Sequence, residues 1–209
     1  MTSIAIRYPL GGTLEYAQNM GVFETFGENE RERIDSISSP HAKELSLGGL
    51  IALKHLTDRA GADGRLEIQR GDNGKPYFKD SPYFFNLSHS GDLSVAVLSD
   101  KRAGIDIERV MPRHSLRKIA KRFFSETEYV RYEQSGDSAE EFYRIWTAKE
   151  ALVKYKGASL AASLAEEYAD GTEEYFKTFS LMYNADMYII TVCLPCEDNV
   201  EILEINNTI

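Results

Sequence analysis

Cysteine is scarce in this sequence of 209 residues. The two cysteines, Cys193 and Cys196, form a C-x-x-C pair that follows the strand-like run 187–192 and encloses Pro195. A redox pair would be expected to open a helix, and a zinc site would need two further ligands nearby, of which none is visible. We therefore interpret the pair as the end of a strand that runs into a turn, with a functional role as the minor alternative.

Long apolar runs and an excess of positive charge are also missing. No apolar run approaches the ~18 residues that a membrane span needs, so no membrane contact is expected. The first residues lack the charged start, apolar run and cleavage pattern of a signal peptide, which makes a cytoplasmic protein the default expectation. The net charge of −9 argues against a general nucleic-acid binder, while leaving room for a local basic patch.

What remains is the composition of an ordinary globular protein, with 43% hydrophobic and 27% charged residues. Strand-like and helix-like segments are mixed without regular alternation, which predicts the α+β class. The length suits one large domain or two small ones, and a boundary near residue 100 would give halves of residues 1–100 and 101–209.

The first half contains one clear helix start. Ser39 and Pro40 suit the N-cap and the first position of a helix. The interior of this helix carries Gly48 and Gly49, each costing about 1 kcal/mol relative to alanine, which suggests close packing or a lost side-chain function. The charged segment 28–35 before it is interpreted as a solvated helix end or loop.

A hairpin is predicted next, from the strand-like runs 83–88 and 93–98. The polar tip between them begins at His89, directly after Ser88. Such a tip can bind an anion through side chains and backbone N–H groups, but it can equally be an ordinary turn.

The segment 146–154 reads as one helix, because it consists mostly of good helix formers and holds no glycine or proline. Glu150 and Lys154 are four residues apart and share a face, while Trp146 and Val153 share an apolar face. An acid and a base can therefore project together from a half-buried helix. A plain surface ion pair is the alternative.

The segment 104–108, GIDIE, has the alternation of a strand. Asp106 and Glu108 are two residues apart and would point to the same side. Two carboxylates so placed repel each other unless a cation lies between them, and Mg²⁺ prefers such oxygen ligands. The pair therefore predicts either a metal site or the polar face of a half-exposed strand.

A local basic run, 113–122, contrasts with the acidic chain and could dock an acidic partner or form a solvated helix face. Ser125 follows as an N-cap candidate, with Glu128 in the position of a capping box. This structural role for Glu128 competes with a catalytic one.

Five motifs occur in an order that is typical of one family: 74–76 (GKP), 85–91 (FNLSHSG), 104–108 (GIDIE), 123–128 (FFSxxE) and 146–154 (WTAKExxxK). Together they resemble the surfactin-synthetase-type 4′-phosphopantetheinyl transferases, and the layout extends over the whole chain. Each motif alone is weak, but the five in order are specific.

The resemblance implies a monomer of two similar α+β halves related by a pseudo-twofold, with coenzyme A between them. It implies transfer of 4′-phosphopantetheine from coenzyme A to a serine of an apo acyl or peptidyl carrier protein, with release of 3′,5′-ADP. A non-catalytic coenzyme A or carrier-binding module of the same fold, or a metal-dependent phosphoesterase, are the alternatives.

The resemblance also implies residue roles. By matching position, Asp106, Glu108 and Glu150 would hold Mg²⁺, with Mn²⁺ left open. Lys154 would contact phosphate, and Glu128 or Glu150 would help to deprotonate the serine. The nucleotide and its phosphates would be held by Lys75, Ser88 and His89. The acidic carrier protein would dock on the basic run, at Arg113, Arg117, Lys118 and Lys121.

One departure concerns the first-half helix, where family members often carry an arginine that binds the 3′-phosphate of the nucleotide. The corresponding place here is expected at Gly48 and Gly49, with Lys43 and Lys54 the nearest basic residues. The sequence therefore does not indicate which residue binds the 3′-phosphate.

Overall fold

The computed structural model describes residues 1–9, 13–62, 64–71, 73–157 and 174–205. The chain divides into two compact units, Met1–Ala103 with Asp198–Ile209 and Gly104–Glu197. Helices and sheets are mixed in both, which confirms the predicted α+β class. The expected boundary at residue 100 lies three residues before this division, and the last strand belongs to the first unit. None of the described helices is long and apolar enough to cross a membrane.

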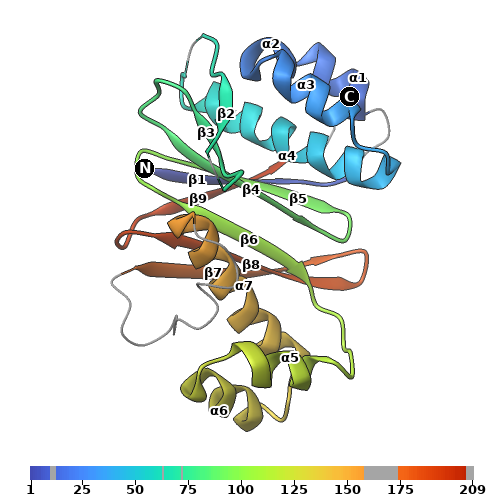
Figure 1. Ribbon diagram of the computed structural model, residues 1–209, viewed down its shortest axis with the longest axis vertical. Coiled ribbons are helices and arrows are strands. Elements are labelled where there is room, and N and C mark those ends of the chain that lie inside the picture. Colours follow the sequence, from blue (N-terminus) through green and yellow to red (C-terminus); the bar gives the residue numbers. More distant parts are fainter. Residues whose placement is uncertain (10–12, 63, 72, 158–173, 206–209) are drawn as a thin grey trace. The chain divides into compact units, whose positions relative to one another are not determined.

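The first unit is built on a four-stranded sheet of order β4-β5-β1-β9, in which only the β1–β9 pair is parallel. Helix α4 packs on this sheet and three short helices pack on α4 (Figure 1). The strands are β1 (Thr2–Arg7), β4 (Phe84–Ser90), β5 (Leu93–Ser99) and β9 (Val200–Ile205), with a separate ribbon of β2 (Ile68–Arg70) and β3 (Pro76–Phe78). The helices are α1 (Thr13–Asn19), α2 (Val22–Phe26), α3 (Glu28–Asp35) and α4 (Pro40–Arg59).

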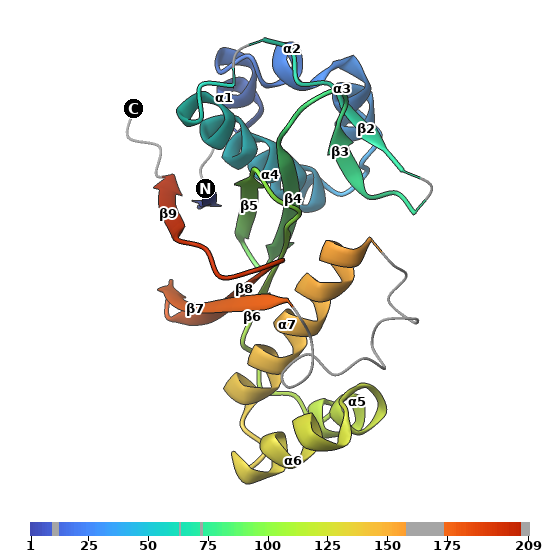
Figure 2. The same ribbon diagram turned by 90° about the vertical axis from the view of Figure 1, so that its left-hand side faces the viewer.

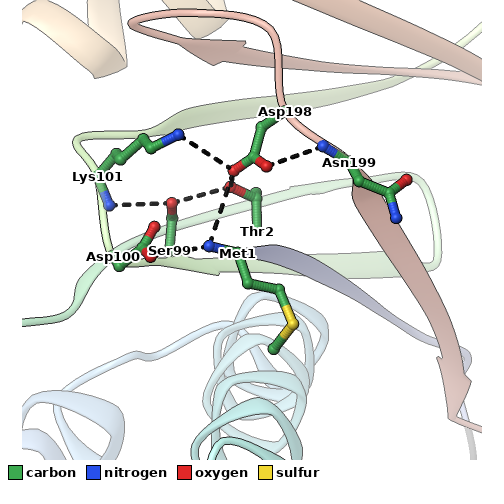
Figure 3. Close-up of polar contacts among 7 residues, drawn as sticks. All are labelled: Met1, Thr2, Ser99, Asp100, Lys101, Asp198 and Asn199. Atoms are coloured by element: carbon green, nitrogen blue, oxygen red, sulfur yellow. Dashed lines mark hydrogen bonds and ion pairs between the residues drawn. The ribbon is translucent and has the colours of Figure 1, made fainter.

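A polar cluster around Asp198 fixes the point where the chain returns to this unit (Figure 3). Thr2 Oγ1 donates to Asp198 Oδ2 at 2.9 Å, and the Asn199 N–H donates to Asp198 Oδ1 at 2.8 Å. The hydrogen bond from Thr2 lowers the pKa of Asp198, and its effect outweighs that of partial burial. The cluster holds the start of β9 beside β1, which explains why the C-terminal strand belongs to the first unit.

Helix α4 begins as predicted. The Ser39 hydroxyl accepts a hydrogen bond from the Ala42 N–H at 3.3 Å, and Pro40 occupies the first helical position. A Cβ on Gly48 would lie 2.9 Å from Ser94 Oγ, whereas one on Gly49 would make ordinary contacts with Leu87 at 3.8 Å. The close-packing interpretation is therefore confirmed for Gly48.

The second unit is a three-stranded antiparallel sheet of order β6-β8-β7 that carries helix α7 (Figure 2). Helices α5 and α6 pack against α7 and each other. The elements are β6 (Gly104–Arg109), α5 (Leu116–Phe123), α6 (Glu126–Gln134), α7 (Ala139–Lys156), β7 (Tyr175–Tyr183) and β8 (Asp186–Leu194). Cys193 is buried in β8 and Cys196 is exposed beyond it, so the predicted strand end is confirmed.

Helix α7 lies unusually close to strand β6 at Gly104. A Cβ built on Gly104 would lie 2.2 Å from the Ala151 carbonyl oxygen and 2.5 Å from the Tyr155 nitrogen. These are backbone atoms, so no side-chain rotation can make room for the added carbon. Only glycine at this position lets the helix take its place on the strand.

Gly104→Ala should therefore destabilise the protein by about 3 kcal/mol, the upper end of overpacking costs. Denaturant unfolding would measure this. Gly49→Ala is the matched control, and it should be neutral or stabilising by up to about 1 kcal/mol because an interior helical glycine is replaced where space exists. A Gly104→Ala protein as stable as the native one would contradict the described packing.

The charged segment 28–35 differs from its prediction, since it forms helix α3 with one acid in the interior. Glu30 is 1% exposed and accepts hydrogen bonds from Arg70 and, at 2.8 Å, from Arg33 Nε. Burial alone would raise the pKa of Glu30, but the hydrogen bonds from Arg70 and Arg33 outweigh it and lower the pKa below the ordinary value of 4.5. The prediction failed because Arg70 comes from a distant part of the chain.

Glu30→Gln should cost about 2 kcal/mol of unfolding free energy at pH 7, where the carboxylate is charged and paired. Because the pKa is lower in the folded state, the contribution is present above pH 4.5 and is lost as the pH falls through the folded value. The difference from the native protein should thus shrink as the pH is lowered below 4.5, as measured by denaturant unfolding. Glu28→Gln, on the exposed side of α3, should change little, and a pH-independent difference for Glu30→Gln would refute the linkage.

Candidate active site

Strand β6 directs its carboxylates toward helix α7. Gly104, Asp106 and Glu108 alternate along the strand and so face the same side, which is the side on which α7 contacts Gly104. Asp106 is buried, while Glu108 is half-buried. The predicted strand with two carboxylates on one face is confirmed.

Helix α7 brings Lys154 to Asp106. The Lys154 ammonium donates to Asp106 Oδ1 at 2.7 Å, and the two side chains are 27% and 7% exposed. Glu150 lies one turn earlier on the same helical face. The structure thus places Asp106 beside Lys154, with Glu150 on the adjoining turn, although Asp106 and Lys154 are 48 residues apart in the chain.

The negative charge around Glu150 is only partly compensated. Burial raises the pKa of Glu150, the charges of Asp106 and Glu108 raise it further, and Lys154 opposes them, so that the pKa reaches about 7. Glu150 therefore lies within the influence of two further carboxylates and of one ammonium. A further cation would relieve the repulsion that this arrangement contains.

The donor set suits a hard divalent ion, because Mg²⁺ prefers carboxylate oxygens and completes its shell with water and substrate phosphate. Within the described ranges, however, no group of three or more His, Cys, Asp or Glu side chains is already arranged to hold a metal ion. The carboxylates of Asp106, Glu108 and Glu150 are therefore of the chemical type that Mg²⁺ prefers, but within the described ranges they do not form a ready-made binding site of three ligands.

Glu128 has the structural role predicted for it. It closes a capping box with Ser125, whose N–H donates to Glu128 Oε2 at 2.7 Å. Lys149 Nζ donates to both carboxylate oxygens, at 2.9 and 3.1 Å, and both side chains are 1% exposed. This buried ion pair joins the start of α6 to α7, one residue before Glu150.

Lys149 was missed by sequence reasoning. Its only local signal is its position beside Glu150 in the helix, where a lysine is normally solvated. The partner, Glu128, lies 21 residues earlier, so the pair could not be found from spacing along one helix.

The predicted nucleotide-binding residues all belong to the first unit. Lys75 directly precedes β3 and is half-buried. Ser88 is buried and His89 is exposed, and both lie within β4, which continues to Ser90. The hairpin is confirmed, but its tip begins later than expected, at Gly91. As consecutive strand residues, Ser88 and His89 face opposite sides of the sheet.

The basic run 113–122 forms helix α5 only from Leu116 onward. Arg117 is already paired, because its guanidinium donates to Asp137 and to Glu133 at 2.7 Å each. Hydrogen bonding to Tyr129, together with these acids, raises the pKa of Arg117. Lys118 and Lys121 are exposed on the same helix, and neither has an ion-pair partner among the described residues.

Comparison with known proteins agrees with these features. A family model described as the 4′-phosphopantetheinyl transferase superfamily matches residues 102–190, which include β6 and α7. HetI of Nostoc sp., described as a 4′-phosphopantetheinyl transferase, is 32% identical over 164 residues, which cover 74% of this chain and 68% of HetI. Sfp of Bacillus subtilis, with the same description, is 33% identical over 158 residues, which cover 66% of this chain and 68% of Sfp.

A third relative matches over a shorter stretch. AcpT of Escherichia coli K12, also described as a 4′-phosphopantetheinyl transferase, is 44% identical over 97 residues. That stretch covers 44% of this chain, and the chain spans about half the length (50%) of the AcpT relative. The extent of the HetI and Sfp matches, together with the family model, shows that the chain belongs to the 4′-phosphopantetheinyl transferase superfamily.

Proposed function

We propose that this protein transfers the 4′-phosphopantetheine arm of coenzyme A to a serine of an apo acyl or peptidyl carrier protein and releases 3′,5′-ADP. The observation that carries the proposal is the contact of Lys154 with Asp106, with Glu150 one turn away, in a chain of this family. Phosphoryl transfer depends mainly on positioning and charge stabilisation, and these residues offer both.

The reaction needs a base, because a serine hydroxyl is a weak nucleophile. Glu150 would accept the hydroxyl proton as the serine oxygen attacks the phosphorus that bears the pantetheine arm. The bond from that phosphorus to the bridging oxygen breaks, and 3′,5′-ADP leaves with the bond's electron pair. Glu128 suits this role less well, since its oxygens already accept hydrogen bonds from Lys149 and Ser125.

Charge develops on the leaving phosphate and must be compensated. Lys154 would supply a positive charge beside Asp106. Asp106, Glu108 and Glu150 would hold Mg²⁺, or Mn²⁺, which would neutralise pyrophosphate oxygens when bound. The nucleotide end of coenzyme A would contact Lys75, Ser88 and His89 of the first unit.

The direct test is the intact mass of an apo carrier protein after incubation with this protein, coenzyme A and Mg²⁺, with and without a chelator. A gain of one phosphopantetheine arm that disappears on chelation would establish both the transfer and its metal. No gain on fatty-acid, polyketide or peptide-synthetase carriers, with coenzyme A still bound, would favour a non-catalytic binding module.

Replacing Glu150 by glutamine should lower the transfer rate by roughly 100-fold or more, because the variant lacks both the base and a carboxylate ligand. Glu140→Gln is the matched control on the same helix, where the native side chain only pairs with Arg144 on the surface. Initial rates from the mass assay, with circular dichroism as a check of folding, would measure both. Equal rates for the two variants would remove Glu150 from the mechanism.

Carrier docking should depend on Lys118 and Lys121 more than on Arg117, whose charge is already neutralised within the protein. Reversing both lysines to glutamate should raise the KM for an acidic carrier roughly tenfold, because complementary surface charge promotes association. The affinity for coenzyme A should not change. Arg117→Gln should alter KM less than twofold, and the opposite ranking would show that the docking face lies elsewhere.

A further inference from the structure

Arg7, the last residue of β1, is a buried cation with an unused hydrogen-bonding edge. Its side chain is 2% exposed, and its guanidinium lies 5.2 Å from the ring centroid of Tyr16. Nη1 donates to the Tyr8 carbonyl oxygen at 3.0 Å. Nε and Nη2 have no hydrogen-bond partner in the described part of the chain. Leaving buried donors unpaired is costly, which raises the question of what they bind.

The arginine lines a cavity of about 270 Å³ within the first unit. The side chains that matter for binding are polar or absent: Arg7, His41, Glu44, Gly48, Asp92 and Ser94. Gly48 lines the cavity where it closely approaches Ser94, because a Cβ there would lie 2.9 Å from Ser94 Oγ and 3.6 Å from Arg7 Cγ. A phosphate group with part of a sugar fits this volume.

Strand register connects the cavity with a residue already expected to hold phosphate. Ser94 of β5 lies opposite Arg7 of β1 on one side and opposite His89 of β4 on the other. Side chains directly opposite each other in a sheet share a face, so the three form one row across the strands. Arg7 is thus the positive member of a row that includes His89.

The free edge of Arg7 defines the ligand chemistry. Nε–H and Nη2–H point the same way and match two oxygens of a phosphate, as in bidentate arginine–phosphate pairs. Burial lowers the pKa of Arg7, while the charges of Tyr16 and Glu44 oppose this effect. Glu44, which accepts a hydrogen bond from Thr13 at 3.0 Å, and Asp92 favour hydroxyl or amine donors in the same ligand.

We propose that this cavity binds a phosphorylated nucleoside and that Arg7 is its phosphate contact. The identification of that nucleoside as the nucleotide end of coenzyme A rests on the proposed function. Arg7 would then supply, from strand β1, the positive charge that helix α4 lacks at Gly48 and Gly49.

The affinity for coenzyme A, measured by titration calorimetry without metal, tests the proposal. The proteins compared are the native protein, Arg7→Met, Arg7→Lys and the control Arg59→Met. The control removes a charge from the exposed end of α4. Arg7→Met should bind coenzyme A roughly ten- to a hundredfold more weakly, the loss expected for a charged bidentate contact. Arg7→Lys should lose less of the affinity than Arg7→Met, and Arg59→Met should keep the affinity of the native protein. Binding of dephospho-coenzyme A shows which phosphate Arg7 contacts. If Arg7→Met loses affinity only for coenzyme A, the contact is to the 3′-phosphate. If it loses affinity equally for both ligands, the contact is to the pyrophosphate.

Thermal unfolding separates binding from a structural role. Because two donors are unpaired, Arg7→Met without ligand should unfold at a temperature no lower than that of the native protein. A lower unfolding temperature with unchanged coenzyme A affinity would overturn the proposal while leaving the transferase function intact. Failure of the native protein to bind coenzyme A would instead refute the proposed function. In that case, inorganic phosphate can still test the site. A rise in the unfolding temperature of the native protein with phosphate, and no rise for Arg7→Met, would support it. No rise for the native protein would refute it.

Discussion

The backbone-to-backbone approach of α7 and β6 at Gly104 is the constraint on which the second unit depends. Because no side chain separates them, Gly104 lies beneath the turn from Ala151 to Tyr155. Asp106, two residues along the strand on the same face, then meets Lys154. The site therefore results from one packing contact, and a shift of the strand by a single residue would turn both carboxylates away from the helix.

Two further contacts fix the rotation of α7. Thr147 Oγ1 and Thr191 Oγ1 share a buried hydrogen bond of 2.8 Å, which ties the helix to β8. On another side, Lys149 forms the buried ion pair with Glu128. Breaking such a pair leaves an uncompensated buried charge, so the helix resists turning. These contacts keep Glu150 directed at the carboxylate strand.

Most of the local structure could be predicted from the sequence, because its signals lie within a few residues of each other. The helix around Glu150, the capping box of Ser125 and the strand containing Asp106 are examples. What could not be predicted depends on partners far along the chain. Glu30 is buried because Arg70 reaches it from 40 residues away, and no periodicity indicates that contact. The common position of Asp106, Glu150 and Lys154 was inferred from family resemblance, whereas the spacing alone also allowed a surface pair.

Both candidate sites contain charge that the folded chain leaves incompletely compensated. In the second unit, burial and the nearby charges of Asp106 and Glu108, opposed by Lys154, raise the pKa of Glu150 to about 7. In the first unit, Arg7 keeps two unpaired donors in a cavity. The two imbalances have opposite sign, and a metal ion and a phosphate are the groups that would relieve them. Sequences normally avoid such costs in their interior, so each of these two places is a candidate for binding a group of the opposite charge.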